Sequence, residues 1–398
     1  MNITERVQNL EYAIRDVVGH AKYLEKNGKK IIYLNIGDPL QFDFRTPEHI
    51  KEALIRAVNE DLNSYSPSEG LPELREAICE KEKRVGKFDV LPENVLVSNG
   101  VSEAIQMVLG ALVDNGDEVL VPGPAYPPYI SYTEFFGGNA VQYKTSEADG
   151  WQPDLDDVRS KITDKTRAII IINPNNPCGA LYDRNTVKAL VDLAGEHDIP
   201  VISDEIYDQI AYDEIVSTAS VAKDVPVIGL NGFSKVYLMT GWRLGYMYFT
   251  GQHEETLANL RENITKEARI RLSANTPVQK AAVAALRGPQ DYIGCMVQKL
   301  KERRDYAYKR LNEIEGIDCA KPNGAFYFFP RVDGIGSKWA NDMAFVHDLM
   351  EQTGIVFVHG SGFGSEYGSG HFRGVFLPPL TTLEESFNRI DNFMKSKK

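Results

Sequence analysis

The chain has 398 residues, with 44 Lys and Arg against 56 Asp and Glu, which gives a formal net charge of −12. Its composition, 43% hydrophobic and 25% charged, is that of a globular protein with a large core, so disordered and fibrous classes are excluded. The acidic balance argues against a nucleic-acid partner, because neutralising phosphates requires clustered Lys and Arg. At this length we expect two domains.

No segment of the sequence suggests attachment to a membrane. The longest aliphatic run, at 168–172, is far too short to span a bilayer, and residues 1–11 lack the apolar core of a signal peptide. The four cysteines lie far apart without a C-x-x-C pair, which suggests neither a zinc cluster nor a disulfide framework. The seven histidines contain no H-E-x-x-H pair, and we assign no metal. Because neither a membrane segment nor a disulfide framework is suggested, we expect a cytoplasmic protein.

In chain order, the first elements are a helix predicted over 15–26 and an extended segment over 31–34. From there to about residue 249, short β-branched runs are each followed by a helical pattern. The runs are apolar throughout rather than alternating, which is typical of strands covered on both faces. The expected strands lie at 95–97, 118–121, 168–172, 201–202, 225–230 and 246–249. This pattern predicts an α/β fold with a mostly parallel sheet flanked by helices.

The C-terminal part has a different pattern, typical of a smaller α+β unit. The expected elements are a long exposed helix over 291–315, an aromatic strand at 325–330, a helix near 342–353 and a strand at 355–358. We place the large domain at 36–290, and we form the small domain from the N-terminal arm, 1–35, together with 291–398.

Three loops at the ends of expected strands carry unusual polar groups. Their sequences are Asn173-Pro-Asn-Asn-Pro-Cys-Gly179, Ser203-Asp-Glu-Ile-Tyr207 and Asn231-Gly-Phe-Ser-Lys235, the last followed by Gly241-Trp-Arg-Leu-Gly245. In parallel sheets, ligands bind at the carboxyl ends of the strands, where the connecting loops converge. We therefore expect these loops to meet in one site.

The residue types in these loops suit a particular chemistry. A lysine that forms a Schiff base needs a desolvated, cation-rich setting that lowers its pKa, and Lys235 is followed in sequence by Arg243. A pyridine ring that serves as an electron sink needs a carboxylate against its ring nitrogen, a role that suits Asp204. A phenol and an amide, Tyr207 and Asn176, are placed to hold the hydroxyl oxygen of such a ring.

With these motifs the sequence resembles the pyridoxal-5′-phosphate-dependent aminotransferases of fold type I, class I/II. The motifs occur in the family's order, and the resemblance spans nearly the whole chain. It implies a homodimeric enzyme that moves an amino group between an L-amino acid and a 2-oxo acid. By the resemblance, Lys235 matches the Schiff-base lysine, and Asp204 and Tyr207 are its catalytic partners. Ser234 and Arg243 match ligands of the cofactor phosphate.

The resemblance implies further cofactor contacts. Val101 and Ser102 match phosphate contacts at the start of a helix, whose free N–H groups form an anion site. Tyr126 matches the aromatic residue that stacks on the pyridine ring, and Tyr129 competes with it for this role. Tyr65 matches a tyrosine that reaches the phosphate from the neighbouring subunit, which implies shared active sites.

The resemblance also implies how the substrate binds. Arg373 matches the arginine that clamps the substrate α-carboxylate, helped by Gly37 and Asn176. The Asn-Gly-x-Ser-Lys motif resembles the alanine aminotransferase (glutamate–pyruvate) branch, which implies L-alanine and 2-oxoglutarate as the substrates. Binding glutamate requires a cation for its distal carboxylate, for which Arg15 is the first candidate and Arg271 the second.

Other interpretations stay open on the sequence alone. An aspartate aminotransferase, a broad-specificity or aromatic aminotransferase, or a pyridoxal-phosphate-dependent lyase would use the same apparatus. Asp204 could instead cap a helix, and Asn176 could serve the proline-bounded turn. A DNA-binding regulator would need an added basic domain, which we do not expect. A dinucleotide-dependent oxidoreductase would need a complete G-x-G-x-x-G after a strand.

Overall fold

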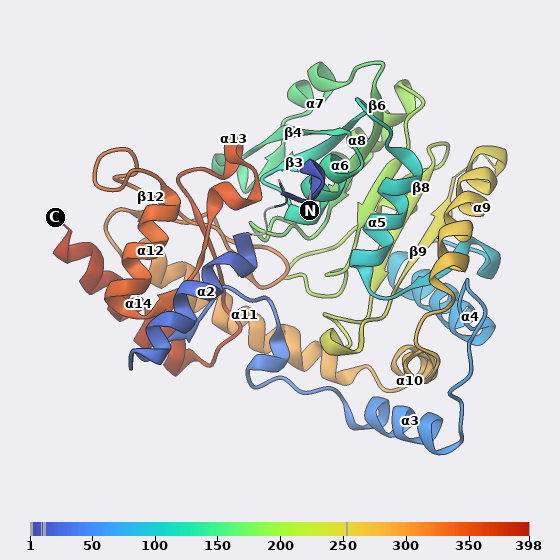
Figure 1. The fold of residues 1–398 in the computed structure, drawn as a ribbon, viewed down its shortest axis with the longest axis horizontal. Coiled ribbons are helices and arrows are strands. Elements are labelled where there is room, and N and C mark those ends of the chain that lie inside the picture. Colours follow the sequence, from blue (N-terminus) through green and yellow to red (C-terminus); the bar gives the residue numbers. More distant parts are fainter. Residues whose placement is uncertain (1–2, 9, 11–12, 252–253, 398) are drawn as a thin grey trace.

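The computed structural model describes residues 1–398 apart from 1–2, 9, 11–12, 252–253 and 398. A large sheet wrapped by helices makes up the middle of the chain, and elements from both ends of the chain gather beside it (Figure 1). None of the helices in the described ranges combines the length and the apolar character needed to cross a bilayer.

The largest sheet in the described residues has eight strands in the spatial order β2-β9-β8-β7-β6-β3-β4-β5. The strands are β2 (Val95–Ser98), β3 (Glu118–Gly123), β4 (Asn139–Ser146), β5 (Gln152–Pro153), β6 (Thr166–Ile172), β7 (Val201–Asp204), β8 (Val227–Gly232) and β9 (Gly245–Thr250). All six expected strands are confirmed. The pairs β4-β3, β3-β6, β6-β7 and β7-β8 are parallel, whereas β9 is antiparallel to both β2 and β8. The mostly parallel sheet is therefore confirmed.

Helices cover both faces of this sheet, as the apolar runs predict. One face packs against α5 (Val101–Leu112), α6 (Pro127–Phe135) and α9 (Glu254–Arg271). The other face packs against α7 (Leu155–Lys161) and α8 (Arg184–Glu196). Strands β2, β7 and β8 consist only of buried residues. The sequence pattern missed β4 and β5, because they lie at the edge of the sheet and carry many polar, half-exposed residues.

A further layer of helices packs beside the sheet, with α10 (Thr276–Arg287) against both α3 (Glu48–Asn59) and α4 (Pro72–Lys81). Helices α2 (Ala13–Lys26), α12 (Asp342–Thr353) and α14 (Leu380–Ser396) lie among the C-terminal strands (Figure 1). The helix expected near 342–353 is confirmed with these bounds.

The C-terminal strands are short. Strand β11 (Tyr327–Phe328) pairs with β15 (Phe372–Val375), which pairs with β14 (Val358–His359). Strand β10 (Ile317–Asp318) pairs with β12 (Arg331–Val332). From the other end of the chain, β1 (Ile32–Tyr33) runs parallel to β13 (Ile355–Val356), with Ile32 opposite Ile355. The N-terminal arm is thereby joined to the C-terminal unit.

The long helix α11 (Asp291–Asn312) forms, but the expectation that it is exposed is wrong for one face. Leu300 and Arg303 are among its buried residues. Arg303 pairs with Asp43, with 2.6 Å between Nη2 and Oδ2. The charged pattern concealed this buried face, because a buried arginine that is paired looks the same in sequence as a solvated one.

Candidate active site

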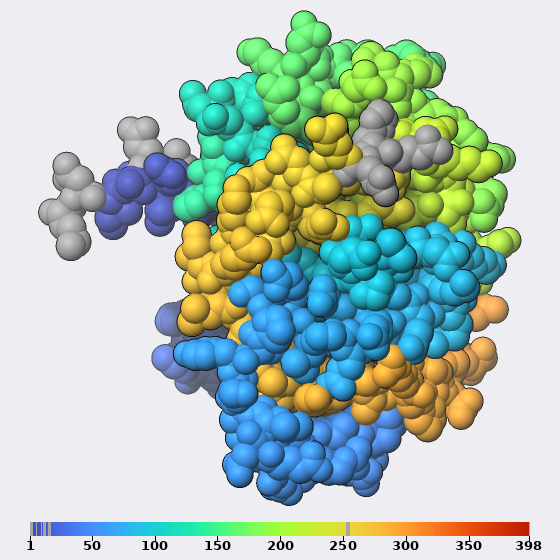
Figure 2. Space-filling model, turned by 90° about the vertical axis from the view of Figure 1, so that its right-hand side faces the viewer, coloured from blue at the N-terminus to red at the C-terminus, as the bar shows by residue number. Residues whose placement is uncertain are grey.

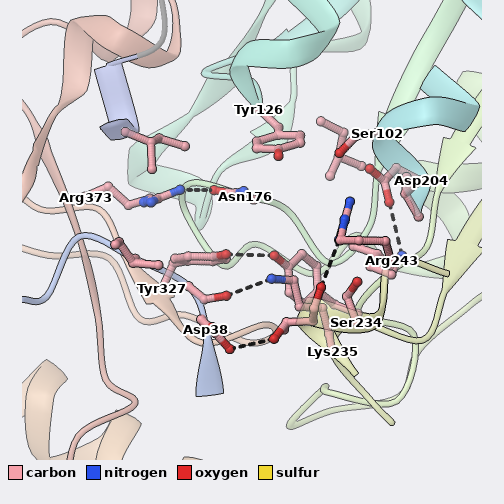
Figure 3. A pocket seen from close by; sticks show the side chains of 18 of the residues that line it. Asp38, Ser102, Tyr126, Asn176, Asp204, Ser234, Lys235, Arg243, Tyr327 and Arg373 are labelled. Atoms are coloured by element: carbon pink, nitrogen blue, oxygen red, sulfur yellow. Dashed lines mark hydrogen bonds between the residues drawn. The ribbon is translucent and has the colours of Figure 1, made fainter. Parts of the chain in front are cut away.

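The predicted strand-end loops meet in one pocket of about 540 Å³ at the carboxyl ends of β7 and β8 (Figure 3). The predicted site residues that line it are Gly37, Val101, Ser102, Tyr126, Asn176, Asp204, Tyr207, Ser234, Lys235, Arg243 and Arg373. Convergence of polar side chains from loops far apart in sequence is typical of a ligand site in an α/β fold.

Lys235 follows β8 and extends into this pocket. Its Nζ donates a hydrogen bond to the carbonyl oxygen of Gly37 at 2.7 Å, which ties the amine to the backbone of the N-terminal segment (Figure 3). Burial lowers the pKa of Lys235 to about 8, and the guanidinium groups of Arg373 and Arg243 contribute to the lowering. A substantial neutral fraction near neutral pH makes this amine a nucleophile and a base.

Asp204 ends β7 with its carboxylate buried. One oxygen accepts from the hydroxyl of Tyr129 at 2.9 Å, and the other accepts from the N–H of Ile206 at 3.1 Å. Burial raises the pKa of Asp204 to about 6, while these hydrogen bonds and the charge of Lys235 oppose the rise. Tyr126 and Tyr129 were both candidates for stacking on the cofactor ring, and they have different positions here. Tyr126 lines the pocket, whereas Tyr129 is buried and hydrogen-bonded to Asp204.

An anion cradle lies at the start of α5. The helix begins at Val101 directly after Gly100, whose φ of 84° favours glycine. A β-carbon on Gly100 would lie 2.5 Å from Nη2 of Arg243, and one on Gly245 would lie 2.7 Å from the backbone nitrogen of Val101. The two glycines therefore let an arginine and a strand approach a helix N-terminus, where free N–H groups attract an anion.

Arg373 is 1% exposed and is held from several sides. Its Nη1 donates to Oδ1 of Asn176 at 2.8 Å, and its Nη2 donates to the carbonyl oxygen of Asn35 at 2.6 Å. Its guanidinium contacts two aromatic rings, 4.6 Å from the centroid of Tyr327 and 4.8 Å from that of Phe363. Nε is buried and has no hydrogen-bond partner among the described residues. Such a fixed cation suits the binding of a carboxylate.

Tyr207 also lines the pocket, three residues after Asp204 in the chain. Its hydroxyl lies 2.8 Å from that of Tyr327, and either oxygen can be the donor. Burial, together with this neighbouring phenol, raises the pKa of Tyr207 well above its usual range, so the side chain stays a protonated donor.

Two of the predicted residues, Tyr65 and Arg271, are not among those that line this pocket. Tyr65 is 82% exposed and lies outside it. The side chain of Arg15 lies outside the described residues. The second candidate for a distal-carboxylate cation, Arg271, points elsewhere: its Nη2 donates to the carbonyl oxygens of Ser68 and Val97.

Comparison with known proteins gives the family. A model of the aminotransferase class I and II family matches residues 29–390. The chain belongs to this family. An alanine aminotransferase from Pyrococcus furiosus shares 57% sequence identity and a TM-score of 0.96, with 99% of this chain and 100% of that one covered. The alanine aminotransferase of Mycobacterium bovis is 40% identical over 98% of this chain and 92% of its own length. The glutamate-pyruvate aminotransferase AlaA of Escherichia coli is 38% identical over 98% and 97%.

The predicted resemblance, fold and enzyme class are thus confirmed. Aminotransferases of class I and II depend on pyridoxal 5′-phosphate, so the predicted cofactor is confirmed as well. The pocket fits this group: a glycine-lined cradle at a helix N-terminus suits the phosphate, and the buried carboxylate of Asp204 suits a protonated ring nitrogen. Elsewhere in the described ranges, His, Cys, Asp and Glu side chains nowhere gather in threes as a metal site would require.

Sequence reasoning missed two tyrosines of this aminotransferase site as structural partners. Tyr129 entered only as a rival of Tyr126, and its bond to Asp204 has no local sequence signal. Tyr327 lay unnoticed in an aromatic strand. A signal was present there, because Tyr327 is the one residue with a hydroxyl in the run Phe326-Tyr-Phe-Phe329, and a buried hydroxyl needs a partner.

Proposed function

We propose that this aminotransferase catalyses the reversible transfer of an amino group between L-alanine and 2-oxoglutarate, giving pyruvate and L-glutamate. The observation that carries this proposal is the apolar lining of the pocket near Arg373, where Ile14 and Ile36 form part of the wall. Such a surface suits the methyl side chain of alanine. The relatives named as alanine and glutamate-pyruvate aminotransferases support the same substrates.

We assign the phosphate of the cofactor to the start of α5, where Val101 and Ser102 offer backbone and hydroxyl donors. Arg243 and Ser234 line the same end of the pocket and would add a charge and a further hydroxyl. Tyr126 would cover one face of the ring.

Asp204, Asn176 and Tyr207 would hold the polar atoms of the ring. Pyridoxal 5′-phosphate supplies, when bound, a ring that withdraws electrons from the Cα of the amino acid. The carboxylate of Asp204 would keep the proton on the ring nitrogen. The phenol of Tyr207 would donate to the ring hydroxyl oxygen, and so would the amide of Asn176, whose Oδ1 is already used by Arg373.

Lys235 is the proposed base and acid. Its Nζ, with a pKa lowered to about 8, would take the proton from Cα of the amino donor and return it on the cofactor side. Arg373 would orient the donor by its α-carboxylate, beside the backbone of Gly37. The hydrogen bond from Lys235 to the Gly37 carbonyl oxygen links the proposed base to the backbone beside the proposed carboxylate site.

A substrate panel tests the specificity. The holoenzyme is mixed with single amino acids, and the conversion of the cofactor absorbance from the aldehyde to the amine form is followed. L-alanine and L-glutamate should give kcat/KM at least about tenfold above L-aspartate and L-phenylalanine. A preference for either of the latter would overturn the assignment, as would release of pyruvate and ammonia from L-serine in place of transamination.

We further propose that Arg15 binds the distal carboxylate of glutamate. Its neighbour Ile14 lines the pocket, which supports a position for residue 15 near the entrance. The described cations of the lining, Lys235, Arg243 and Arg373, already have other proposed roles. Arg15→Ala should raise KM for glutamate far more than KM for alanine, whereas Lys22→Ala on the same helix should change neither. Equal effects of Arg15→Ala on both substrates would refute the role.

We also propose a homodimer with shared active sites. Tyr65 and Ile270 are 82% and 84% exposed, and their segments adjoin, since Ser68 Oγ donates to the carbonyl oxygen of Leu272. Helix α1 (Glu5–Gln8) projects from the body of the molecule (Figure 2) and exposes Val7. Large exposed apolar side chains of this kind are typical of interfaces.

Mixed dimers test the shared site. If Tyr65 acts in the site of a second copy, co-expressed Lys235→Ala and Tyr65→Ala chains should regain up to about a quarter of the wild-type activity, because each mixed dimer keeps one intact site. Activity no higher than that of either variant alone, or a monomer by sedimentation, would contradict the proposal.

Finally, we propose the division into a large domain at 36–290 and a small domain of 1–35 with 291–398, supported by the pairing of Ile32–Tyr33 with Ile355–Val356. Limited proteolysis should cut between these units before it cuts within them.

We propose the cytoplasm as the location, supported by the four free cysteines. Fractionation of the source cells tests this assignment.

A further inference from the structure

Tyr327 is one of the residues that line the pocket. It lies on β11, which pairs with β15 so that Tyr327 is opposite Val375, two residues from Arg373. The side chain lies in the pocket next to the carboxylate clamp (Figure 3). None of the roles assigned above belongs to it.

The hydroxyl of Tyr327 is fixed by its surroundings. It lies 2.8 Å from the hydroxyl of Tyr207, and the two rings meet edge to face at 5.8 Å between centroids. A β-carbon on Gly37 would lie 2.1 Å from the Tyr327 oxygen, so only glycine at 37 leaves room for it. The hydroxyl thus sits between Tyr207 and the backbone that holds Lys235.

The ring of Tyr327 has a separate contact. The Arg373 guanidinium lies 4.6 Å from its centroid and 4.8 Å from that of Phe363. An arginine over two aromatic faces is attracted by both and has little freedom to move. One side chain therefore contacts the proposed cofactor phenol with its hydroxyl and the proposed substrate clamp with its ring.

We propose that Tyr327 is a positioning residue that sets both Tyr207 and Arg373. A phenol has one proton to donate, so a Tyr207 that donates to the ring oxygen of the cofactor leaves its own oxygen as an acceptor. Tyr327 is the donor that fills this place and strengthens the Tyr207 bond through the chain of hydroxyls. The proposal rests on the proposed roles of Tyr207 and Arg373.

The two contacts can be separated by substitution. Tyr327→Phe removes the hydroxyl and keeps the ring beside Arg373, whereas Tyr327→Leu removes both. Tyr212→Phe is the matched control, because the Tyr212 hydroxyl donates to the Ala325 carbonyl at 2.7 Å and does not line the pocket. Thermal unfolding of each holoenzyme shows whether the fold is kept.

The hydroxyl contact is tested by titrating the absorbance of the holoenzyme with pH in the absence of substrate. A donor on the ring oxygen stabilises its negative charge, so loss of support should raise the apparent pKa of the chromophore by about half a unit or more in Tyr327→Phe. Tyr207→Phe should give a larger rise, and the double variant should match Tyr207→Phe alone, because Tyr327 acts through Tyr207. An unchanged pKa in Tyr327→Phe, or shifts that add in the double variant, would overturn this contact.

The ring contact is tested with propionate, which has the carboxylate and methyl group of alanine but no amine. Its dissociation constant, read from the same absorbance, should stay within about twofold in Tyr327→Phe and rise about tenfold or more in Tyr327→Leu. Equal weakening in both variants would overturn the ring contact.

The proposed roles of Tyr207 and Arg373 are each tested by a separate measurement. A Tyr207→Phe holoenzyme with an unchanged chromophore pKa would remove the proposed role of Tyr207, and with it the hydroxyl contact. An Arg373→Lys holoenzyme that binds propionate as wild type does would remove the clamp and the ring contact. With both roles intact, the Tyr327 variants alone decide the inference.

Discussion

Gly100 and Arg243 approach so closely that a β-carbon at residue 100 would lie 2.5 Å from Nη2 of the arginine. The sequence separates them widely, yet together they make the anion cradle at the start of α5. A glycine here does more than permit a turn, because it sets how near a cation can come to a helix N-terminus.

Gly100→Ala should therefore weaken cofactor binding. Displacing Arg243 would remove its proposed charge-assisted hydrogen bond to the cofactor phosphate, worth roughly 1.5–3 kcal/mol, so the dissociation constant of pyridoxal 5′-phosphate should rise about tenfold or more. Fluorescence titration of the apoprotein measures this constant.

The matched control for that substitution is Gly116→Ala. Gly116 has almost the same φ, 86° against 84° at Gly100, but a β-carbon on it would meet no atom within 4 Å. Gly116→Ala should lose about 1 kcal/mol of stability from backbone strain, and Gly100→Ala should lose more, because the ψ of 162° at Gly100 lies in a region that only glycine populates. Only Gly100→Ala should lose cofactor affinity, and equal affinities for the two variants would contradict the cradle.

The bond from Tyr129 to Asp204 predicts a pH dependence of cofactor binding. The pKa of Asp204 is raised to about 6 by burial, so its carboxylate becomes protonated, and unable to pair with a cationic ring nitrogen, as the pH falls through 6. The Tyr129 bond opposes this rise, and Tyr129→Phe should raise the pKa further. The loss of affinity on acidification should begin at a higher pH in the variant, as measured by titrating apoprotein between about pH 5 and 8.

Tyr143→Phe controls for the loss of a buried tyrosine hydroxyl. Tyr143 is fully buried, and its hydroxyl donates to the carbonyl oxygen of Ile170 at 2.9 Å, away from Asp204. Its pH profile of cofactor binding should overlay that of the wild type. A Tyr129→Phe profile that also overlays the wild type would show that the tyrosine does not tune Asp204.

The lowered pKa of Lys235 predicts how fast the apoprotein captures its cofactor. Only the neutral amine attacks an aldehyde, so the rate of covalent capture should rise with pH and level off above about 8, rather than near the 10.4 of an ordinary lysine. Stopped-flow absorbance gives the profile. Lys235→Arg should show no borohydride-trapped adduct, and a wild-type midpoint near 10 would contradict the buried, cation-rich setting.

Lys81 should be critical for stability although it lies outside the pocket. It is 1% exposed, and its Nζ lies 2.9 Å from Oε1 of Glu82 and contacts Asp208. Asp208 also accepts a hydrogen bond from the amide of Asn231, near the end of β8. Lys81→Met would leave two buried carboxylates without their cation, at a cost of about 3–5 kcal/mol. Urea unfolding of the apoprotein measures this loss.

The neighbouring Lys83 provides the contrast. It pairs with Asp89 at 2.8 Å, but both side chains are exposed. Lys83→Met should leave the urea midpoint almost unchanged, because an exposed ion pair contributes little to stability. Similar midpoints for the two methionine variants would mean that the buried network contributes little to the fold.

Much of this site could be predicted from the sequence, because its chemistry is concentrated in short motifs. Lys235, Asp204 and Asn176 each follow an apolar strand, and parallel strands bring their carboxyl ends together. The α/β fold followed from the same strands. Strand β4, next to the edge strand β5, was missed, since half-exposed polar residues interrupt the apolar run on which the prediction depended.

The contacts between side chains could not be predicted in this way. The bond from Tyr129 to Asp204 and the pair of Tyr327 with Tyr207 join residues from different elements, and no spacing encodes them. The buried face of α11 was hidden for the same reason, because Arg303 finds Asp43 only once the chain is folded.

Because β1 pairs with β13, this part of the fold can form only after nearly the whole chain has been synthesised. During translation, residues 32–33 leave the ribosome long before residues 355–356 exist, so β1 has no strand partner while the central sheet is already emerging. The proposed cofactor contacts within one chain lie between residues 101 and 243, so they leave the ribosome well before the proposed carboxylate clamp at Arg373. A nascent chain therefore holds the residues proposed for the vitamin before it holds the arginine proposed for the amino acid.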